Sequence, residues 1–169
     1  MLSYCADLVR KHSRDDLLLC LFMPAEAREA VLAVYALNIE LAQVREKTSE
    51  ELIGQVRLAW WQEAVEALYA GHPARDQPVL QALAPVIASG HPPRESVMAL
   101  IENYRVHFPD SPPDIEAAMD EATLALLRAL CPQAEAGWRK ARNIILKHRR
   151  RHGQRRNGWL NFKLLVAGM

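Results

Sequence analysis

The sequence predicts an all-α protein, and three observations support that prediction. Apolar residues recur three and four positions apart through most of the chain, the spacing of one face of a helix. Proline, serine, aspartate and glycine divide this pattern into segments of helical length. Alternating apolar and polar runs joined by hairpin turns do not occur in the sequence, so β-strands are not expected. The 169 residues suffice for one sizeable core, and we expect a single helical domain over 1–169.

In the N-terminal half, helix start signals precede the periodic segments. We expect a short helix over 2–11, a long one over 24–46, and a third that ends at residue 70. Ser13 and Asp16 have the spacing of an N-terminal cap with a carboxylate three residues on. Pro24 suits the first turn of the long helix. The sequence TSEE at 48–51 has the pattern of a capping box, in which side chains bond the free amides at the start of the next helix.

In the C-terminal half, proline and glycine mark most of the boundaries. The expected helices are 78–88, 94–107, 115–130 and 133–152, with Asp114 as the cap of the third. A loop over 153–158 and a short apolar tail over 159–169 follow. We therefore expect a body over 1–130, and a basic helix with an apolar tail over 133–169.

Charge is divided sharply along the chain. Residues 1–138 contain 11 Lys and Arg against 20 Asp and Glu, a net charge of −9. Residues 139–169 contain 10 Lys and Arg and no acidic residue, a net charge of +10. A segregated basic end indicates an anionic partner, which can be lipid headgroups, nucleic acid, another protein or the acidic body of the chain itself.

The basic helix is also amphipathic. Trp138, Ala141, Ile144 and Ile145 fall on one side of it. The cations around the other side, which are candidates for binding a membrane or another anion, are Arg139, Lys140, Arg142, Lys147, Arg149, Arg150 and Arg151. This pattern is typical of a helix lying on an anionic membrane, and equally of a C-terminal helix docked on the body. Residues 149–156 could contact nucleic acid, but they lack a recognised reading motif and aromatic interleaving.

The composition predicts a cytoplasmic protein without a membrane-spanning segment. No run approaches the roughly 20 apolar residues that a membrane span needs, and we expect no secretory signal. Cys5, Cys20 and Cys131 are odd in number and widely spaced. We expect them to be reduced, buried thiols rather than a zinc site or a disulfide framework.

Three stretches resemble a known protein family: CLFMP at 20–24, YALNIELAQVRE at 35–46 and WWQE at 60–63. They are similar to the opening helices of the squalene/phytoene synthase family, which implies an isoprenoid-synthase-like helical bundle, here a partial one. NxELAQV at 38–44 and RLAWW at 57–61 are similar to the non-catalytic branch that includes the mitochondrial complex I assembly factor. The family's members are longer, so this chain is a natural short paralogue or has lost an internal segment; both remain open.

The resemblance also shows what the chain lacks. Where the enzymes carry an aspartate-rich motif that binds Mg²⁺ and prenyl diphosphate, this chain reads AQVRE at 42–46. Mg²⁺ on a diphosphate requires hard oxygen ligands, usually carboxylates. The nearest match to the segment before the second acidic motif, NIILKH at 143–148, is followed by RRRH rather than aspartates. We therefore expect no metal, no cofactor and no catalytic residues.

The resemblance implies that residues 24–66 form the remnant of the family's substrate cavity. The side chains that we expect to line this cavity are Tyr35, Asn38, Gln43, Arg45, Arg57 and Trp61. They could hold a lipid or a segment of a partner, or be purely structural. Trp60 and Trp61 are adjacent, so they point about 100° apart on a helix, and at least one should be deeply buried as a core anchor.

The resulting functional prediction is a pseudoenzyme that serves as an accessory or assembly protein. Its partner would be a membrane complex of the respiratory complex I type at a bacterial inner membrane. One alternative is a Mg²⁺-dependent prenyltransferase that condenses prenyl diphosphates. A second alternative is a basic-tailed nucleic-acid-binding protein. The number of carboxylates facing the central cavity separates the first two: four or more favour the enzyme, and one or none favours the pseudoenzyme.

Overall fold

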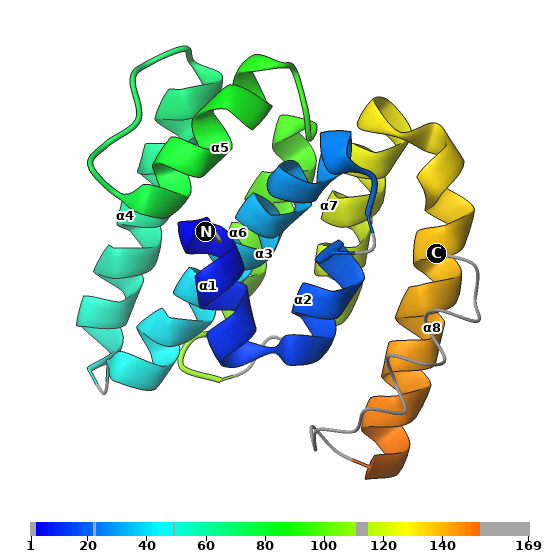
Figure 1. The fold of residues 1–169 in the computed structure, drawn as a ribbon. Helices are drawn as coiled ribbons and strands as arrows, with labels where there is room; N and C mark the ends of the chain where they lie inside the picture. Colours follow the sequence, from blue (N-terminus) through cyan, green and yellow to red (C-terminus); the bar gives the residue numbers. More distant parts are fainter. Residues whose placement is uncertain (1–2, 22, 49, 111–114, 153–169) are drawn as a thin grey trace.

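The computed structural model describes residues 3–21, 23–48, 50–110 and 115–152, and within these ranges the side chains of all but 26, 115, 116 and 148–152. The helices are α1 (Tyr4–His12), α2 (Arg14–Leu21), α3 (Ala25–Lys47), α4 (Glu51–Tyr69), α5 (Pro78–Ala88), α6 (Arg94–His107), α7 (Ile115–Leu130) and α8 (Glu135–His152), with a 3₁₀ turn η1 (Pro132–Ala134) before α8 (Figure 1). The described part of the chain contains no strand, so the all-α prediction is confirmed. None of its helices combines the length and apolar composition needed to cross a membrane.

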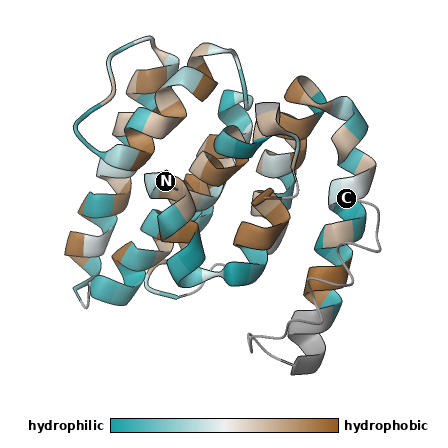
Figure 2. Ribbon diagram, viewed as in Figure 1, coloured by the Kyte–Doolittle hydropathy of each residue, from teal (hydrophilic) through white to brown (hydrophobic). Residues whose placement is uncertain are grey.

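Helix α3 forms the centre of the molecule. It packs against α1, α2, α4, α5, α6 and α7, and α4 and α5 lie on one side of it with α7 on the other (Figure 1). Every residue from Val31 to Leu37 is buried. A helix that is apolar around most of its circumference gains stability only when neighbours cover all of its sides. The hydrophobic middle of α3 therefore determines how the other helices are arranged around it (Figure 2).

Side-chain caps account for several helix starts. The Oγ of Ser3 accepts the backbone N–H of Ala6 at 3.3 Å at the start of α1. The Oγ of Ser13 accepts the N–H of Asp16 at 3.2 Å, which confirms the cap predicted there. That cap starts a separate helix, α2, whose extent the sequence analysis left unassigned. Such a bond satisfies one of the amides that the first turn leaves without a helical partner.

The predicted capping box before α4 is wrong. The residue at the N-cap is Glu50, in an extended conformation and without a side-chain cap bond. The Oγ1 of Thr48 instead accepts a hydrogen bond from Nη1 of Arg57 at 2.9 Å, two turns into α4. A hydroxyl engaged by a guanidinium on the next helix is directed away from the amides it was expected to cap.

Helices α4 and α6 approach each other closely at Gly54. A Cβ at this position would lie 2.0 Å from Cζ of Phe108, closer than any real contact. The Nε2 of Gln55 donates to the carbonyl oxygen of Arg105 at 3.0 Å, which ties the same turn of α4 to the end of α6. The absence of a side chain at Gly54 thus makes room for the Phe108 ring.

The remaining boundaries agree with the sequence analysis to within two or three residues. The basic helix begins at Glu135 rather than at residue 133, because Pro132 opens the short 3₁₀ turn η1. Cys5, Cys20 and Cys131 are free and buried, as predicted. Burial raises the pKa of the Cys5 thiol to about 11, so it is protonated at neutral pH. The predicted Asp114 cap, the loop 153–158 and the tail 159–169 lie outside the described residues.

Candidate binding site

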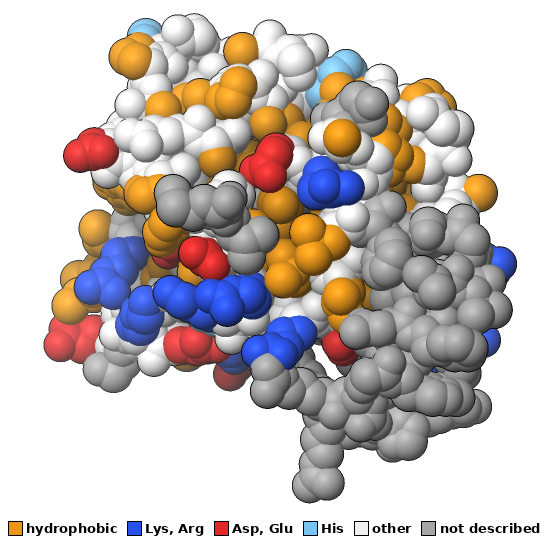
Figure 3. Space-filling model, viewed as in Figure 1, with side chains coloured by type: hydrophobic (Ala, Val, Ile, Leu, Met, Phe, Trp, Pro, Cys, Tyr) orange, Lys and Arg blue, Asp and Glu red, His pale blue; other side chains and the backbone are white. Residues whose placement is uncertain are grey.

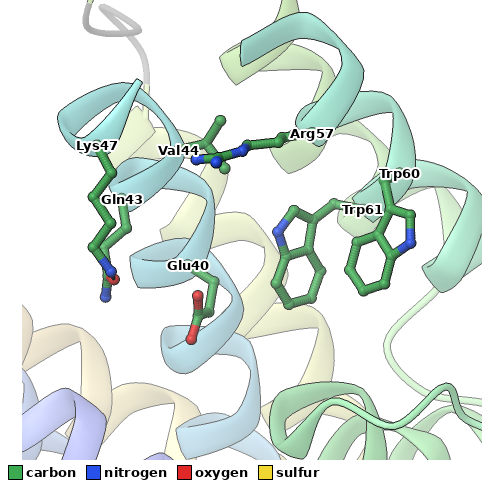
Figure 4. Close-up of a pocket in the computed structure, with 7 residues that line it drawn as sticks. All are labelled: Glu40, Gln43, Val44, Lys47, Arg57, Trp60 and Trp61. Atoms are coloured by element: carbon green, nitrogen blue, oxygen red, sulfur yellow. Dashed lines mark hydrogen bonds between the residues drawn. The ribbon is translucent and has the colours of Figure 1, made fainter. Parts of the chain in front are cut away.

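A cavity of about 270 Å³ opens between α3 and α4 (Figure 4). Residues four or three apart on each helix share a face, so two short periodic sets meet across the gap. The lining residues are Glu40, Gln43, Val44 and Lys47 of α3 with Arg57, Trp60 and Trp61 of α4. We refer to this cavity as the α3–α4 pocket.

Helix α1 abuts the α3 wall of the pocket. The hydroxyl of Tyr4 donates to Oε1 of Glu40 at 3.4 Å. The Nε2 of His12 and the Nε2 of Gln43 are 3.2 Å apart, which makes a hydrogen bond when that imidazole nitrogen is the acceptor. Lys47 in turn donates to Oε1 of Gln43. Polar side chains from two helices thus fix the orientation of this wall.

Two cations of the pocket, Lys47 and Arg57, bond only neutral oxygens. The guanidinium of Arg57 extends from α4 toward Val44 of α3 and donates to the Thr48 hydroxyl (Figure 4). The ammonium of Lys47 donates to the amide of Gln43. Among the side chains that the structure describes, neither cation has a carboxylate within 4.0 Å. The pocket therefore has positive charge available for an anionic group.

The two tryptophans have different environments. The Trp61 side chain is 6% exposed and belongs to the core, whereas Trp60 is 37% exposed. Their rings meet edge to face with centroids 5.3 Å apart, and the guanidinium of Arg75 lies 5.2 Å from the Trp60 ring. The prediction that at least one is deeply buried is confirmed at Trp61, while Trp60 forms an outer wall of the pocket.

Three of the six predicted lining residues, Gln43, Arg57 and Trp61, lie in the pocket. The other three, Tyr35, Asn38 and Arg45, lie elsewhere around α3. Asn38 accepts the hydroxyl of Tyr104 at 2.9 Å through Oδ1.

Tyr35 and Arg45 point to other neighbours of α3. Tyr35 is in the core, where burial raises the pKa of its hydroxyl well above the usual value and no described atom bonds its oxygen. Arg45 faces α6, where its charge opposes the rise in the pKa of Tyr104 that burial causes. These two side chains therefore belong to packed interfaces rather than to a ligand site.

Sequence reasoning missed four lining residues, namely Glu40, Val44, Lys47 and Trp60. A periodic signal was available, because Glu40, Gln43 and Lys47 follow one another at helical spacing on the face of α3 that carries the predicted residue Gln43. Trp60 was expected in the core, although it lies one turn from Arg57. The side of α4 that each tryptophan faces depends on where α3 and α6 pack.

The pocket contains one carboxylate, Glu40, among its described lining residues. Two carboxylates further along α4 are engaged elsewhere: Glu63 lies 3.8 Å from Arg75, and Glu66 pairs with Arg94 at 2.8 Å. Within the described ranges no three His, Cys, Asp or Glu residues are grouped so that they could hold a metal ion. The pocket residues do not fit the Mg²⁺–diphosphate site of a prenyltransferase, which requires several convergent carboxylates.

The apolar side of α8 is docked on the body. Trp138, Ala141 and Ile145 are buried, and α8 packs against α2 and α7. Of the two interpretations left open for this helix, the docked arrangement accounts for its apolar face. Membrane insertion of that face would require α8 to leave the body.

Arg142 is not the surface cation that the sequence suggested. It is 4% exposed, and its Nε donates to Oδ1 of Asp120 on α7 at 2.7 Å. Arg139, Lys140 and Lys147 are exposed, and Arg139 pairs with Glu135 at 2.8 Å. The side chains of Arg149, Arg150 and Arg151 lie outside the described residues.

The chain belongs to the squalene/phytoene synthase family, whose sequence profile matches residues 9–119. The all-α structure agrees with that membership. Among curated proteins, the chain is similar to NADH dehydrogenase (ubiquinone) complex I, assembly factor 6. It is 43% identical to the Homo sapiens protein over 76 residues, which cover 45% of this chain and 22% of that protein. It is 34% identical to the Mus musculus protein over 107 residues, which cover 63% of this chain and 32% of that protein.

These relatives are considerably longer than the matched region. The Drosophila melanogaster homolog of the same assembly factor is 31% identical over 91 residues, covering 51% of this chain and 27% of that protein. The matched part of the chain thus spans about a quarter to a third of the length of these relatives. No solved structure matches the chain significantly.

Proposed function

We propose that this chain is a non-catalytic member of its family and acts as an accessory protein in the assembly of a membrane complex of the respiratory complex I type. Two lines of support meet. The similar curated proteins are named as complex I assembly factors. The α3–α4 pocket lies where the family resemblance places the first metal-binding motif, and its chemistry is different.

The observation that best supports a loss of catalysis is the charge of that pocket. It combines one carboxylate, Glu40, with two cations, Lys47 and Arg57. Departure of a diphosphate depends on Mg²⁺ neutralising the developing charge, and Mg²⁺ requires several oxygen ligands held on one side. The described lining of this pocket has one carboxylate beside two cations instead. The pocket can instead hold the anionic end of a lipid or of a partner segment, with its apolar part against Trp60 and Trp61.

The test of non-catalysis is an incubation with farnesyl and geranylgeranyl diphosphates and Mg²⁺. We expect no C30 or C40 product from the purified chain, at any Mg²⁺ concentration. Product that forms with the wild type and disappears in Glu40→Gln would overturn the proposal in favour of the prenyltransferase alternative. An authentic squalene synthase assayed in parallel shows that the substrates are active.

The assembly role has a separate test in the source organism. A strain lacking the chain should contain less assembled complex I, as measured by native gel electrophoresis and NADH oxidation by membranes. The wild-type gene should restore it. Unchanged complex I content in the deletion strain would contradict the role.

We also propose peripheral contact with anionic lipid through the outer side of α8. The apolar side of that helix is buried, so the attraction rests on exposed cations such as Lys140 and Lys147 and on the basic run after them. Such attraction is screened within roughly 8 Å at physiological salt. The relatives reported above come from animals, so the bacterial inner membrane stays a prediction.

Co-sedimentation with vesicles checks this contact. Binding should rise with the fraction of anionic lipid and fall as salt is added. Replacing Arg149, Arg150 and Arg151 together by glutamine should weaken it. Equal binding to neutral vesicles, or none to either kind, would contradict the contact.

A further inference from the structure

The outer side of α4 carries a row of exposed apolar side chains. Leu52 is 76% exposed and Val56 62%, and Ile53 and Trp60 are exposed beside them. We call Leu52, Ile53, Val56 and Trp60 the α4 apolar row. Four of the seven exposed large hydrophobic residues in the described part of the chain lie in it, and hydrophobic segments are visible near the lower end of α4 in Figure 2. Clustered exposed apolar surface marks interaction sites more often than scattered residues do.

The row has the geometry of a helix-binding face. Leu52, Val56 and Trp60 follow at intervals of four residues, so they form a continuous stripe over about two turns, roughly 12 Å at 1.5 Å per residue. The opposite side of α4, with Leu58, Trp61 and Val65, is buried in the core. The stripe is therefore held on a rigid, packed element, and an amphipathic helix can lie along it with its own apolar residues inward.

The charged residues around the α4 apolar row are not evenly mixed. Arg57 flanks the row on the side of the α3–α4 pocket, with Lys47 across that pocket, and among the described side chains both bond neutral oxygens and no carboxylate. Lys and Arg side chains gather on this part of the surface, over the region of α1, α3 and α4 (Figure 3). Carboxylates stand at the two ends: Glu50 and Glu51 before the row, and Glu63, close to Arg75, after it.

We propose that the α4 apolar row is the docking site for an amphipathic helix of a partner protein, with Asp or Glu residues of that helix reaching Arg57 and Lys47. This inference rests on the proposed assembly role, which requires a protein partner. A uniform anionic membrane fits the row less well, because it would repel Glu50, Glu51 and Glu63 while attracting Arg57. A helix can place carboxylates opposite the cations alone.

Designed peptides provide the test. Three helical peptides share leucines at intervals of four residues and differ only in the residues flanking that stripe, which are glutamate, glutamine or lysine. Binding of each labelled peptide to the full chain is measured by fluorescence anisotropy. We expect the glutamate peptide to bind about tenfold more tightly than the glutamine peptide, equivalent to about 1.4 kcal/mol. The lysine peptide should bind most weakly.

Matched variants assign the binding to this surface. The double variant Lys47→Gln/Arg57→Gln should remove the preference for glutamate over glutamine and leave the affinity for the glutamine peptide unchanged. The double variant Leu52→Ser/Val56→Ser should weaken binding of both peptides about tenfold or more. Leu21→Ser, at an exposed apolar residue of α2, is the control and should change neither. Melting temperatures of all variants show that each is folded.

Three results of the peptide experiments would overturn the inference, and a fourth result concerns dimer formation. The first three are equal affinity for the glutamate and lysine peptides, no saturable binding of the glutamate peptide, and loss of binding in Leu21→Ser but not in Leu52→Ser/Val56→Ser. A concentration-dependent dimer that only Leu52→Ser/Val56→Ser abolishes would assign the row to a second copy of the chain, and also overturn it. Failure in any of these ways leaves the product assay and the complex I measurement unaffected, so the proposed function is judged separately.

Discussion

Helices α4 and α8 lie on opposite sides of the molecule (Figure 1). Both carry cations beside apolar residues, but these residues are packed differently in the two helices. On α8 the apolar residues are buried against α2 and α7, and Arg142 is buried with its charge directed at Asp120. On α4 an apolar row remains exposed, and Arg57 bonds a neutral hydroxyl.

An apolar pattern in the sequence shows which side of a helix is apolar, but it does not show what covers that side in the folded protein. The strongly basic α8 resembles a surface-binding helix in sequence, yet the body of the chain covers its apolar side. The motif-bearing α4 resembles a core helix, yet Leu52, Val56 and Trp60 on one side of it are exposed. Removing a buried cation from its carboxylate partner destabilises the fold, whereas a cation that bonds only neutral groups of the described chain is available to a ligand.

The largest expected effect concerns the buried side of α4. Trp61→Ala should lower the free energy of unfolding by about 3–5 kcal/mol, as large-to-small changes in cores do. Trp60→Ala is the matched control and should cost clearly less, because Trp60 is 37% exposed whereas Trp61 is 6% exposed. Urea denaturation followed by circular dichroism measures both. If the two variants unfold at the same urea concentration, the assignment of inner and outer sides of α4 is wrong.

The next effect tests whether α8 is docked through its ion pair. Arg142→Met should cost about 2–3 kcal/mol, somewhat less than the ~3–5 kcal/mol for a fully buried pair, because Asp120 retains some exposure to solvent. Adding Asp120→Leu to Arg142→Met should recover part of the loss, since the uncompensated carboxylate is then gone. Thermal or urea unfolding measures the three stabilities. A single variant that is as stable as the wild type would show that α8 does not depend on this contact.

Substitutions on the open side of α4 should be nearly neutral for stability. Leu52→Ser/Val56→Ser should change the free energy of unfolding by about 1 kcal/mol or less, mostly through helix propensity. The measurement is the same urea titration that is used for Trp61→Ala. A loss comparable to that of Trp61→Ala would mean that the row is covered within the chain, which would remove the basis for a docking site.

The smallest effect is a pH dependence at the junction of α7 and α8. Hydrogen bonds from Arg128 and then Arg139 lower the pKa of Glu135 below its usual value. A lowered carboxyl pKa stabilises the fold above the unfolded pKa, and that contribution is lost as the pH falls through the folded value. The melting temperatures of the wild type and Glu135→Gln should therefore converge at acidic pH. Because the group is exposed, added salt should also reduce the difference.

Most of the fold could be predicted from local signals. Pro78 and Pro93, the glycines after α4 and α5, and the Ser13 cap place helix ends correctly because they act within one turn of the chain. The predicted capping box before α4 was wrong because a non-local contact competes with it. The Thr48 hydroxyl bonds Arg57, a residue two turns further along, and no local pattern announces that competition.

The candidate site was predictable only in part. Gln43, Arg57 and Trp61 lie in the pocket, whereas Tyr35, Asn38 and Arg45 occupy other sides of the same helix. Because α3 is covered by six neighbours, a polar residue on it can face any of several interfaces. Periodicity shows which residues share a side, and only packing shows which neighbour that side meets.

The sequence by itself determined that this chain is all-α, that its cysteines are unpaired and buried, and that it resembles the squalene/phytoene synthase family. Each of these follows from residue identity or from spacing within a few turns. Only the tertiary structure decided that Arg142 is an internal ion-pair partner, that Trp60 is partly exposed and Trp61 buried, and that Lys47 and Arg57 line the same pocket. Those outcomes depend on how distant helices exclude water from one another, because a charge or an apolar side chain acquires its role from what covers it.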